Sequence, residues 1–393
     1  MRFLASKKNI QNLLYATLFL LPLHPYVFYV TLLPCLLLWA VNHCTTGEVK
    51  CVRPRLWGLP AVFLACAFFS GFHSPDPAFS LMNWAFQPLM YAAIYLLILS
   101  LLSSVREKEK ALYAFLAGAI CVAAYGFIQY ANVAGMAADM TAPLLRRRMY
   151  STLENPNLLG AYAVMIISIL TAFFLRERQK KRKWAFAIIL FILLLCLALT
   201  YSRGAWLSLA AIVLGLTLFY DKRFGFLFFL IPLVLFFYHG QMVERFLSLF
   251  SGEDTSVGLR FALWESTIAM IEEHPLLGVG WGSYYLAYPD YNFFIQDEHV
   301  LIFHAHNMYL NMLAEVGIIG GAAFLLTFFA QGFLCWKLYR GKASLFTRTL
   351  GLGGLLMVMA IAVLSMSDHV LFGRSISFCF WSLSALCVGS GDW

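Results

Sequence analysis

The sequence predicts an all-α, polytopic integral membrane protein with about twelve transmembrane helices, forming a single membrane domain over residues 1–393. Three observations predict this class. Hydrophobic residues make up 61% of the chain and charged residues only 12%, whereas a soluble domain carries roughly 25% charged residues. Apolar runs of about 20 residues recur along the chain, and this length is enough to cross a bilayer as a helix. The alternation typical of a transmembrane β-barrel is absent from the sequence.

The predicted spans begin near the N-terminus. Three basic residues precede the first apolar run and no small-residue cleavage site follows it, so we interpret it as an uncleaved helix rather than a signal peptide. Pro22 and Pro25 divide one long apolar run into the first and second spans. The twelve predicted spans cover residues 10–23, 25–42, 56–73, 83–103, 111–134, 157–175, 184–200, 204–220, 224–239, 308–335, 347–366 and 371–389.

The segments between the spans differ in length and charge. The densest basic run, Arg176–Lys183, separates the sixth span from the seventh. Ser202-Arg203-Gly204 separates the seventh span from the eighth with almost no loop. The only long interval of mixed polarity follows the ninth span, and it predicts an external loop over residues 240–307 that carries part of a functional site.

Basic residues are distributed unequally between the two sides of the predicted bundle. With both termini cytoplasmic, the inner segments hold 21 Lys and Arg and the outer segments hold 7, as the positive-inside rule requires. Removing one early span would disrupt this alternation, so we retain twelve. Because membrane orientation accounts for the net charge of +8, the sequence predicts no nucleic-acid partner. The nine cysteines are scattered without a CxxC pair and predict no disulfide framework.

All seven outer basic residues are arginines, whereas every lysine is on the inner side. Solvated flanks have no reason to exclude lysine, but paired hydrogen bonds to phosphate favour arginine. Arg203 either extends to lipid headgroups or binds an anion. Arg260 is predicted to begin an amphipathic helix that runs to Glu273, where a cation opposes the helix dipole and makes an anionic partner more favourable. Arg148 ends a run of three arginines that binds lipid phosphates non-specifically or belongs to the site.

His304 and His306 lie where the external loop meets the tenth span. A histidine that titrates near neutral pH is suited to remove a proton from a hydroxyl, and His306 is the candidate base. Asn307, Asn311 and Glu315 follow at intervals of four residues, so we expect them to share one helix face. Glu315 is predicted at membrane depth, where ionisable side chains are usually functional.

A zinc site at the two histidines is the alternative to a base. Residues two apart on a helix face different ways, and the spacing is not that of HExxH or paired-cysteine zinc sites. No third ligand is obvious, although Asp297 and His299 are close in sequence. The sequence therefore predicts no metal and no other cofactor.

Two further elements belong to the outer rim. Asn155 is predicted to cap the sixth span ahead of Pro156, with Asn157 in its first turn. Asp368 lies at the last outer turn, where it is predicted either to pair with Arg374 or to orient an imidazole. Capping alone, and a purely structural ion pair, are the alternatives to a functional role.

Together these residues resemble the motifs of the bacterial O-antigen ligase and O-antigen polymerase superfamily. No single motif is specific, but their order and spacing are. The core of the resemblance spans about residues 148–320, and the twelve-span layout extends it over the chain. The matching elements are Arg148 ahead of Asn155-Pro156-Asn157, Ser202-Arg203-Gly204, Gly258-Leu259-Arg260, the loop Pro275 to Gly280, His306-Asn307 to Leu310, Glu315 to Gly320, and Ser367-Asp368 with Arg374-Ser375.

The resemblance implies a GT-C-like membrane glycosyltransferase that takes a glycan from undecaprenyl diphosphate on the periplasmic side of the bacterial inner membrane. It implies that Arg203 and Arg260 hold the diphosphate and that His306 activates the acceptor hydroxyl, with inversion and without a metal. The expected partners are the lipid-linked donor, a lipid A–core acceptor and membrane lipids. Supporting roles are expected for Arg148, Asn155, Asn157, Asn307, Glu315, Asp368 and Arg374.

Two other functions remain open. The sister polymerase uses the same donor but extends a second lipid-linked glycan, and the fairly short external loop leaves ligase and polymerase undecided. A transporter of lipid-linked sugars is the non-enzymatic alternative. A transporter typically places charges or broken helices near the membrane midplane, whereas the charges here collect at one face.

Overall fold

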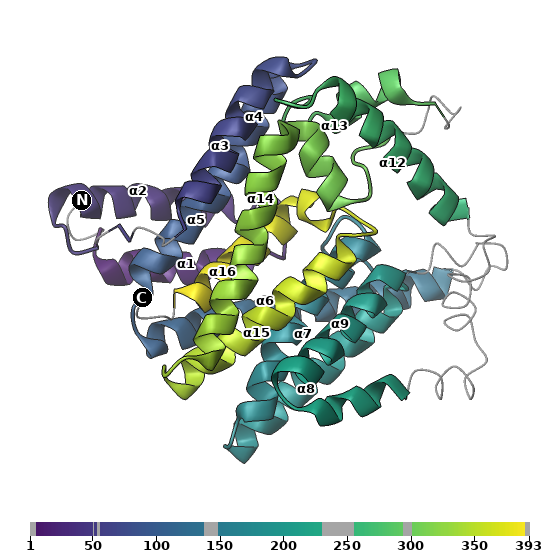
Figure 1. Cartoon of the computed structure of the whole chain (residues 1–393). Helices are drawn as coiled ribbons and strands as arrows, with labels where there is room; N and C mark the ends of the chain where they lie inside the picture. The colour runs from purple at the N-terminus through teal and green to yellow at the C-terminus, as the bar shows by residue number, and fades with distance from the viewer. Residues whose placement is uncertain are drawn as a thin grey trace.

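The computed structural model describes residues 5–49, 51–52, 56–136, 148–229, 255–293 and 301–389, and their regular structure is helical throughout (Figure 1). This confirms the all-α prediction for the described part of the chain. The elements are α1 (Lys7–Leu20), α2 (Tyr29–Thr45), α3 (Gly58–Ser70), η1 (Gly71–His73), α4 (Pro77–Phe86), α5 (Pro88–Leu101), α6 (Val105–Met136), α7 (Pro156–Arg176), α8 (Lys180–Leu199), α9 (Arg203–Phe219), η3 (Lys222–Phe229), α12 (Thr255–Glu273), α13 (Tyr284–Ala287), η4 (Tyr288–Tyr291), α14 (Met308–Arg340), α15 (Leu345–Leu364), η5 (Val370–Phe372) and α16 (Arg374–Val388).

The described helices follow most of the predicted spans. Six helical segments are long and apolar enough to cross a membrane: Pro77–Leu101, Val105–Asn132, Pro156–Arg176, Lys180–Leu199, Met308–Arg340 and Leu345–Leu364. Four further apolar helices are shorter: Tyr29–Thr45, Gly58–His73, Arg203–Phe219 and Arg374–Val388. The ninth predicted span begins within η3, and its residues 230–239 lie outside the described residues. The polytopic membrane class is supported, and the count of twelve spans stays a prediction.

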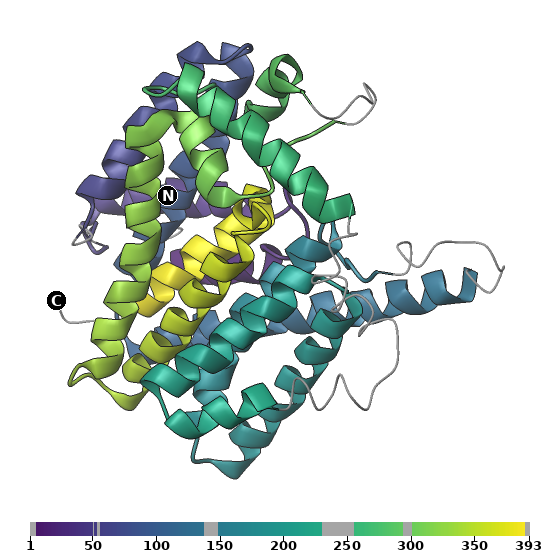
Figure 2. The same cartoon turned by 45° about the vertical axis from the view of Figure 1, so that its right-hand side comes forward.

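The bundle is built around α14 and α15. These two helices pack together, α15 also contacts α7 and α9, and α14 also contacts α3 (Figures 1 and 2). Close approach between α7 and α15 needs a glycine, because a Cβ at Gly353 would lie 2.8 Å from the Cα of Ile169. Small residues of this kind allow membrane helices to pack backbone to backbone.

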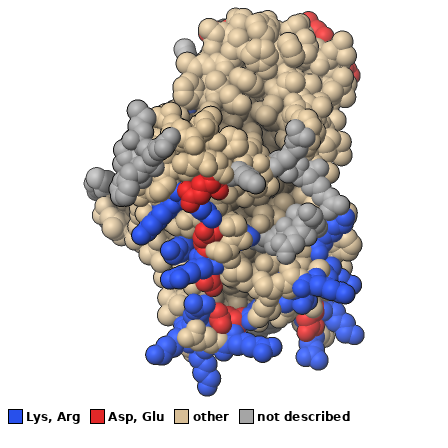
Figure 3. Space-filling view, turned by 90° about the vertical axis from the view of Figure 1, so that its left-hand side faces the viewer, with Lys and Arg blue, Asp and Glu red and all other residues tan. Residues whose placement is uncertain are grey.

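Charged contacts bring several chain segments to one end of the bundle. Lys7 at the start of α1 pairs with Glu107 at 3.2 Å, and Arg182 at the start of α8 pairs with Glu109 at 3.6 Å. Lys108 donates to the carbonyl of Gly389 at the end of α16 at 2.8 Å. The start of α1, the start of α8 and the end of α16 therefore lie at the same end. Figure 3 shows Lys and Arg gathered on the lower half of one face, with almost no charge above them.

A break in α14 positions a loop over the opposite end. Gly317 has φ +72°, and a Cβ there would lie 2.1 Å from the carbonyl oxygen of Leu276. Only glycine adopts this conformation readily. The loop from Pro275 to Gly280 lies in the break, where Gly280 donates its N–H to the carbonyl of Glu315 at 3.0 Å. Gly280 and Gly317, both in motifs that resemble the family, thus attach the loop after α12 to the tenth predicted span.

Candidate active site

His306 lies in a short loop whose shape is set by two asparagines of α14. Asn307 caps the helix by accepting from the N–H groups of Tyr309 and Leu310. The Asn311 Oδ1 accepts from the N–H of Ala305 at 2.9 Å. His306 itself has φ +48°, a left-handed conformation that is uncommon for a non-glycine residue. Such strained positions cluster at functional sites, and here the strain turns the imidazole toward the α15–α16 turn.

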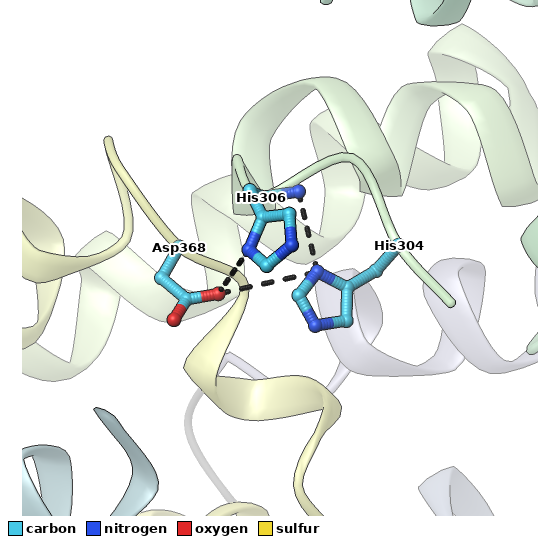
Figure 4. Close-up of side chains that lie close together, drawn as sticks. All are labelled: His304, His306 and Asp368. Atoms are coloured by element: carbon cyan, nitrogen blue, oxygen red, sulfur yellow. Dashed lines mark hydrogen bonds and ion pairs between the residues drawn. The ribbon is translucent and has the colours of Figure 1, made fainter. Parts of the chain in front are cut away.

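The His306 imidazole is oriented by Asp368, which lies between α15 and α16 (Figure 4). Its Nδ1 is 3.0 Å from Oδ1 of Asp368, a distance at which Nδ1–H donates to the carboxylate. Burial raises the pKa of Asp368, but the hydrogen bond from His306 and the neighbouring groups lower it well below its usual range, so the carboxylate is ionised. Because Nδ1 holds the proton, the Nε2 lone pair of His306 remains available to accept a proton from a substrate hydroxyl.

His304 supports this arrangement from inside the loop. Its Nδ1 accepts the backbone N–H of His306 at 3.2 Å, and the two rings touch with centroids 4.4 Å apart. Burial lowers the pKa of His304 to about 4, so its 4.0 Å approach to Asp368 is not an ion pair at neutral pH. The His304 side chain is 15% exposed against 36% for His306. Of these two histidines, His306 is therefore the one that a substrate reaches more readily.

A chain of hydrogen bonds continues from Asp368 to Arg148. Asn157 Nδ2 donates to Oδ2 of Asp368 at 2.7 Å, and its Oδ1 accepts from Arg148 Nη2 at 3.1 Å. Arg148 also donates through Nε to the carbonyl of Thr200 at 2.7 Å. Asn155 caps α7, as expected, by accepting from the N–H groups of Asn157 and Leu158. The Asn-Pro-Asn element therefore both starts α7 and connects Arg148 to the His306–Asp368 pair. Arg146 and Arg147 lie outside the described residues.

Arg203 begins α9 next to the turn that carries Asp368. A Cβ at Gly204 would lie 3.0 Å from the hydroxyl of Ser367, so the start of α9 packs against this turn. Tyr201, two residues before Arg203, has φ +50°. Ser151, His306 and Tyr201 are the non-glycine residues with positive φ in the described part of the chain, and all three lie in segments that surround the site.

The prediction that Arg260 begins a helix is wrong. α12 begins at Thr255, which places Arg260 in the second turn. The helix is longer than expected because residues 255–259 continue its α-helical conformation, so the dipole argument for an anion at Arg260 weakens. Leu263 of α12 belongs to a buried cluster with Val279, Tyr284 and Ala305, which fixes this helix beside the histidine loop.

Glu315 and Arg374, two other predicted site residues, contact groups other than the site histidines. Glu315 is buried, and its carboxylate accepts from the N–H groups of Gly282 at 3.0 Å and Tyr284 at 3.4 Å, so it holds the loop after α12. Arg374 lies with its Cζ 4.7 Å from the centroid of the Tyr26 ring, a cation–π contact. The described contacts of Asp368 are with His306, His304, Asn157 and the backbone, which favours the alternative in which Asp368 orients an imidazole over a pair with Arg374.

His304, His306 and Asp368 also form a group that could hold a metal ion, since one ligand atom from each lies within 4.8 Å of the others. Asp368 lies 62 residues from His306 in the sequence, so an analysis that considered only nearby residues did not find it as a third ligand. Asp297 and His299 lie outside the described residues. The Nδ1 atoms of both histidines are already engaged, one as acceptor and one as donor, so a metal there would replace two hydrogen bonds. The geometry favours an oriented base, and the absence of a metal stays a prediction.

Sequence reasoning missed the structural parts of the site. Thr200 contributes through its backbone carbonyl, which no residue pattern reports. His369 is buried beside His304, with ring centroids 5.9 Å apart. In the sequence, only its position directly after Asp368 could have indicated that His369 lies near the site.

The fold and site define a helical membrane protein with a histidine–aspartate pair beside arginine-bearing helix ends. Residues 188–325 match the model of the O-antigen ligase family, which confirms the resemblance to the O-antigen ligase superfamily that the motifs indicate.

Two curated proteins of Acinetobacter baylyi are also similar to this chain. A ComP-specific O-oligosaccharyltransferase is 24% identical over 188 residues, covering 44% of this chain and 33% of that protein. A general O-oligosaccharyltransferase is 23% identical over 317 residues, covering 74% of this chain and 54% of that protein. The matches thus span about a third to a half of the length of these relatives.

Proposed function

We propose that the chain is an O-antigen ligase-like glycosyltransferase that moves a glycan from undecaprenyl diphosphate to the lipid A–core oligosaccharide at the periplasmic side of the inner membrane. The His306–Asp368 pair is the observation that carries this proposal. An ionised, buried carboxylate that holds Nδ1–H leaves Nε2 positioned as a general base, which typically contributes 10²–10⁴-fold to rate.

The reaction follows from the residues in order. The acceptor hydroxyl transfers its proton to Nε2 of His306 as its oxygen forms a bond to the anomeric carbon. The bond from that carbon to the diphosphate oxygen breaks, and the electron pair leaves on the diphosphate. Attack opposite the leaving group inverts the anomeric centre. Arg203 and Arg260 are the groups proposed to stabilise the developing charge, since guanidinium groups bind phosphate through paired hydrogen bonds.

The orientation is part of the proposal. The end at which Lys7, Arg182 and Gly389 meet is proposed to be cytoplasmic, with both termini there. The segments that carry His306 and Asp368 connect the other ends of the helices, which supports a reaction at the periplasmic surface. The positive-inside distribution supports this direction.

The acceptor has two alternatives to lipid A–core. A second lipid-linked glycan would make the chain a polymerase. Two similar proteins are O-oligosaccharyltransferases, and one of them is ComP-specific by name. This similarity supports a third class of acceptor, to which ComP belongs.

Purified protein with a lipid-diphosphate-linked glycan tests these functions. Product on lipid A–core supports the ligase, lengthened lipid-linked chains support the polymerase, and glycosylated ComP supports the third class. His306→Ala is expected to bind the donor and fail to transfer, whereas the exposed His73→Ala should retain wild-type turnover. Transfer is expected to survive EDTA. Loss of transfer on chelation, with recovery on adding zinc or magnesium, would assign the histidines as ligands and overturn the base mechanism.

A further inference from the structure

Two arginines meet at the end of the bundle opposite the His306–Asp368 pair. Arg176 is the last residue of α7, and Arg348 lies in the first turn of α15. The other ends of these two helices carry Asn157 and the turn with Asp368. α7 has 21 residues, which is about 30 Å at 1.5 Å per residue and matches the hydrocarbon thickness of a bilayer. The arginine pair is therefore separate from the candidate active site, and the proposed reaction does not use it.

Tyr339, near the end of α14, contacts both guanidinium groups. The Nε of Arg348 donates to the backbone carbonyl of Tyr339 at 3.1 Å. The Cζ of Arg176 lies 5.6 Å from the centroid of the Tyr339 ring, which is a cation–π contact. The helices pack closely here, because a Cβ at Gly351 of α15 would lie 2.7 Å from the backbone nitrogen of Tyr339. The packing of α7 and α15 against α14 thus brings the two guanidinium groups together.

The charge of this pair is not neutralised within the described part of the chain. Arg176 and Arg348 are close enough to interact electrostatically, and like charges repel each other. No described carboxylate forms an ion pair with either of them. The Nη1 of Arg176 is buried and bonds to none of the described residues, while the Nε bond of Arg348 leaves its terminal nitrogens available. Because an unpartnered buried donor is costly, an anion with several oxygen acceptors would stabilise this end of the bundle.

Membrane orientation alone does not explain this arrangement. Basic residues that only set the orientation need neither burial nor a common position. Arg178 and Lys342 at the same end are of this kind, since both are exposed. Glu177 follows Arg176 directly, yet its carboxylate accepts from the backbone N–H of Gln179 at 2.8 Å instead of forming an ion pair with that arginine. Arg176 and Arg348 therefore form a half-buried cationic site without a protein counter-ion among the described residues.

Apolar and aromatic side chains place this site at the level of the lipid headgroups. Trp336 of α14 is one turn before Tyr339, and its indole is exposed. Leu345, one turn before Arg348 at the start of α15, is also exposed. Tryptophan is enriched where the hydrocarbon core of a membrane meets the headgroups. An anion bound at Arg348 thus lies next to apolar surface, which favours the phosphate of a lipid over a soluble anion.

We propose that Arg176 and Arg348 bind the phosphate of an anionic phospholipid, in the leaflet opposite the active site. Guanidinium groups donate paired hydrogen bonds to phosphate oxygens. In the proposed orientation this leaflet is the cytoplasmic one, and the lipid is a structural ligand rather than a substrate. The bound phosphate joins α7 to α15 at the ends opposite Asn157 and Asp368. It therefore stabilises the packing on which the hydrogen bond between these two residues depends.

Titration of the purified full chain in uncharged detergent with short-chain phosphatidylglycerol tests the proposal. The thermal unfolding midpoint is the readout, because a ligand of the folded state raises it, and its dependence on lipid concentration gives an apparent Kd. We expect Arg176→Gln and Arg348→Gln each to raise this Kd at least about tenfold, the loss expected for one charge-assisted hydrogen bond. Arg178→Gln and Lys342→Gln are the matched controls, since each removes one exposed charge at the same end. Their Kd should stay within about twofold of the wild type.

Each alternative has its own outcome. An equal loss of affinity in the control variants would show that only the summed charge of this end attracts the lipid, and would overturn the site. Unchanged affinity in both arginine variants would overturn it too. Inorganic phosphate at the same concentrations should leave the midpoint unchanged. An equal shift with inorganic phosphate would assign the site to a free anion and overturn the lipid assignment.

A second measurement uses the wild type alone, so it holds even if the arginine variants fail to fold. The probe is a phosphatidylglycerol with a photoreactive group in its headgroup. We expect crosslinks in the last turn of α7 and the first turn of α15. Crosslinks that are equally frequent at the basic starts of α6 and α8 would overturn the proposal. Both measurements report binding rather than glycan transfer, so their outcome is independent of the proposed function.

Discussion

Replacing Asp368 by asparagine tests whether the carboxylate orients His306, the proposed catalytic base. Asp368 accepts three hydrogen bonds: from Nδ1 of His306 at 3.0 Å and the N–H of His369 at 2.8 Å on one oxygen, and from Asn157 at 2.7 Å on the other. The Asn157 amide cannot turn freely, because its oxygen accepts from Arg148. An amide at residue 368 therefore presents its NH₂ group to a donor in either orientation.

The size of the effect follows from these contacts. If the new NH₂ faces Asn157, two donors oppose each other at the former 2.7 Å contact. If it faces His306, the imidazole must accept at Nδ1, so the proton moves to Nε2 and the base is lost. A hydrogen bond to a charged group is worth about 1.5–3 kcal/mol, and about 1.4 kcal/mol is a tenfold change in rate. We expect turnover to fall by about 10–10²-fold, which reaches the lower end of the range for a lost general base.

The assay is steady-state transfer from a lipid-linked donor in detergent, with kcat and the donor KM measured separately. Asp368→Asn should lower kcat and leave the donor KM within about threefold, because the carboxylate does not hold the diphosphate in this mechanism. Asp290→Asn is the matched control, since Asp290 is an exposed carboxylate on η4. If Asp368→Asn kept more than half of the wild-type kcat while folding normally, the orientation argument for His306 would be refuted.

Three further predictions concern charge, pH and backbone. Arg203→Lys and Arg260→Lys should each lower turnover by roughly ten- to hundredfold, because lysine lacks the paired donors of arginine; full activity in Arg260→Lys would make it only a helix residue. His304 has a folded pKa of about 4, below the unfolded value of about 6.5, so the unfolded state takes up the proton first and stability is lost as pH falls from about 6.5 toward 4. Thermal unfolding should show a loss of about 2 kcal/mol between pH 6.5 and 5, and His304→Gln should reduce this slope; an unchanged slope would contradict the buried neutral state. Gly317→Ala should destabilise the fold by at least about 2 kcal/mol, because residue 317 has a positive φ and a Cβ there would clash with the loop. Gly58 faces open space, so Gly58→Ala should change the stability by less than about 0.5 kcal/mol. Equal midpoints of thermal unfolding for the two variants would argue against the break in α14.

Much of the fold could be predicted because it is encoded locally. Apolar length and the placement of prolines predict where helices form, and Asn155 and Asn307 cap their helices through bonds to residues two or three positions away. Within the fourth predicted span, α4 and α5 meet at Gln87, directly before Pro88, which is again a local cause. The break in α14 at Gly317 is different, because the contact with Leu276 explains it and no local pattern predicts that contact.

The sequence by itself determined the membrane class, predicted that all basic residues of the outer segments are arginines, and singled out His306 as the candidate base, because composition and nearest-neighbour motifs carry that information. Only the tertiary structure decided which groups act on that base. Asp368 lies 62 residues from His306 and 211 residues from Asn157 along the chain. The tertiary structure also assigned Glu315 to loop anchoring and left an apolar cavity behind His369. These contacts arise from the packing of α7, α14, α15 and α16, and the geometry of that packing depends on all their side chains together rather than on any short motif.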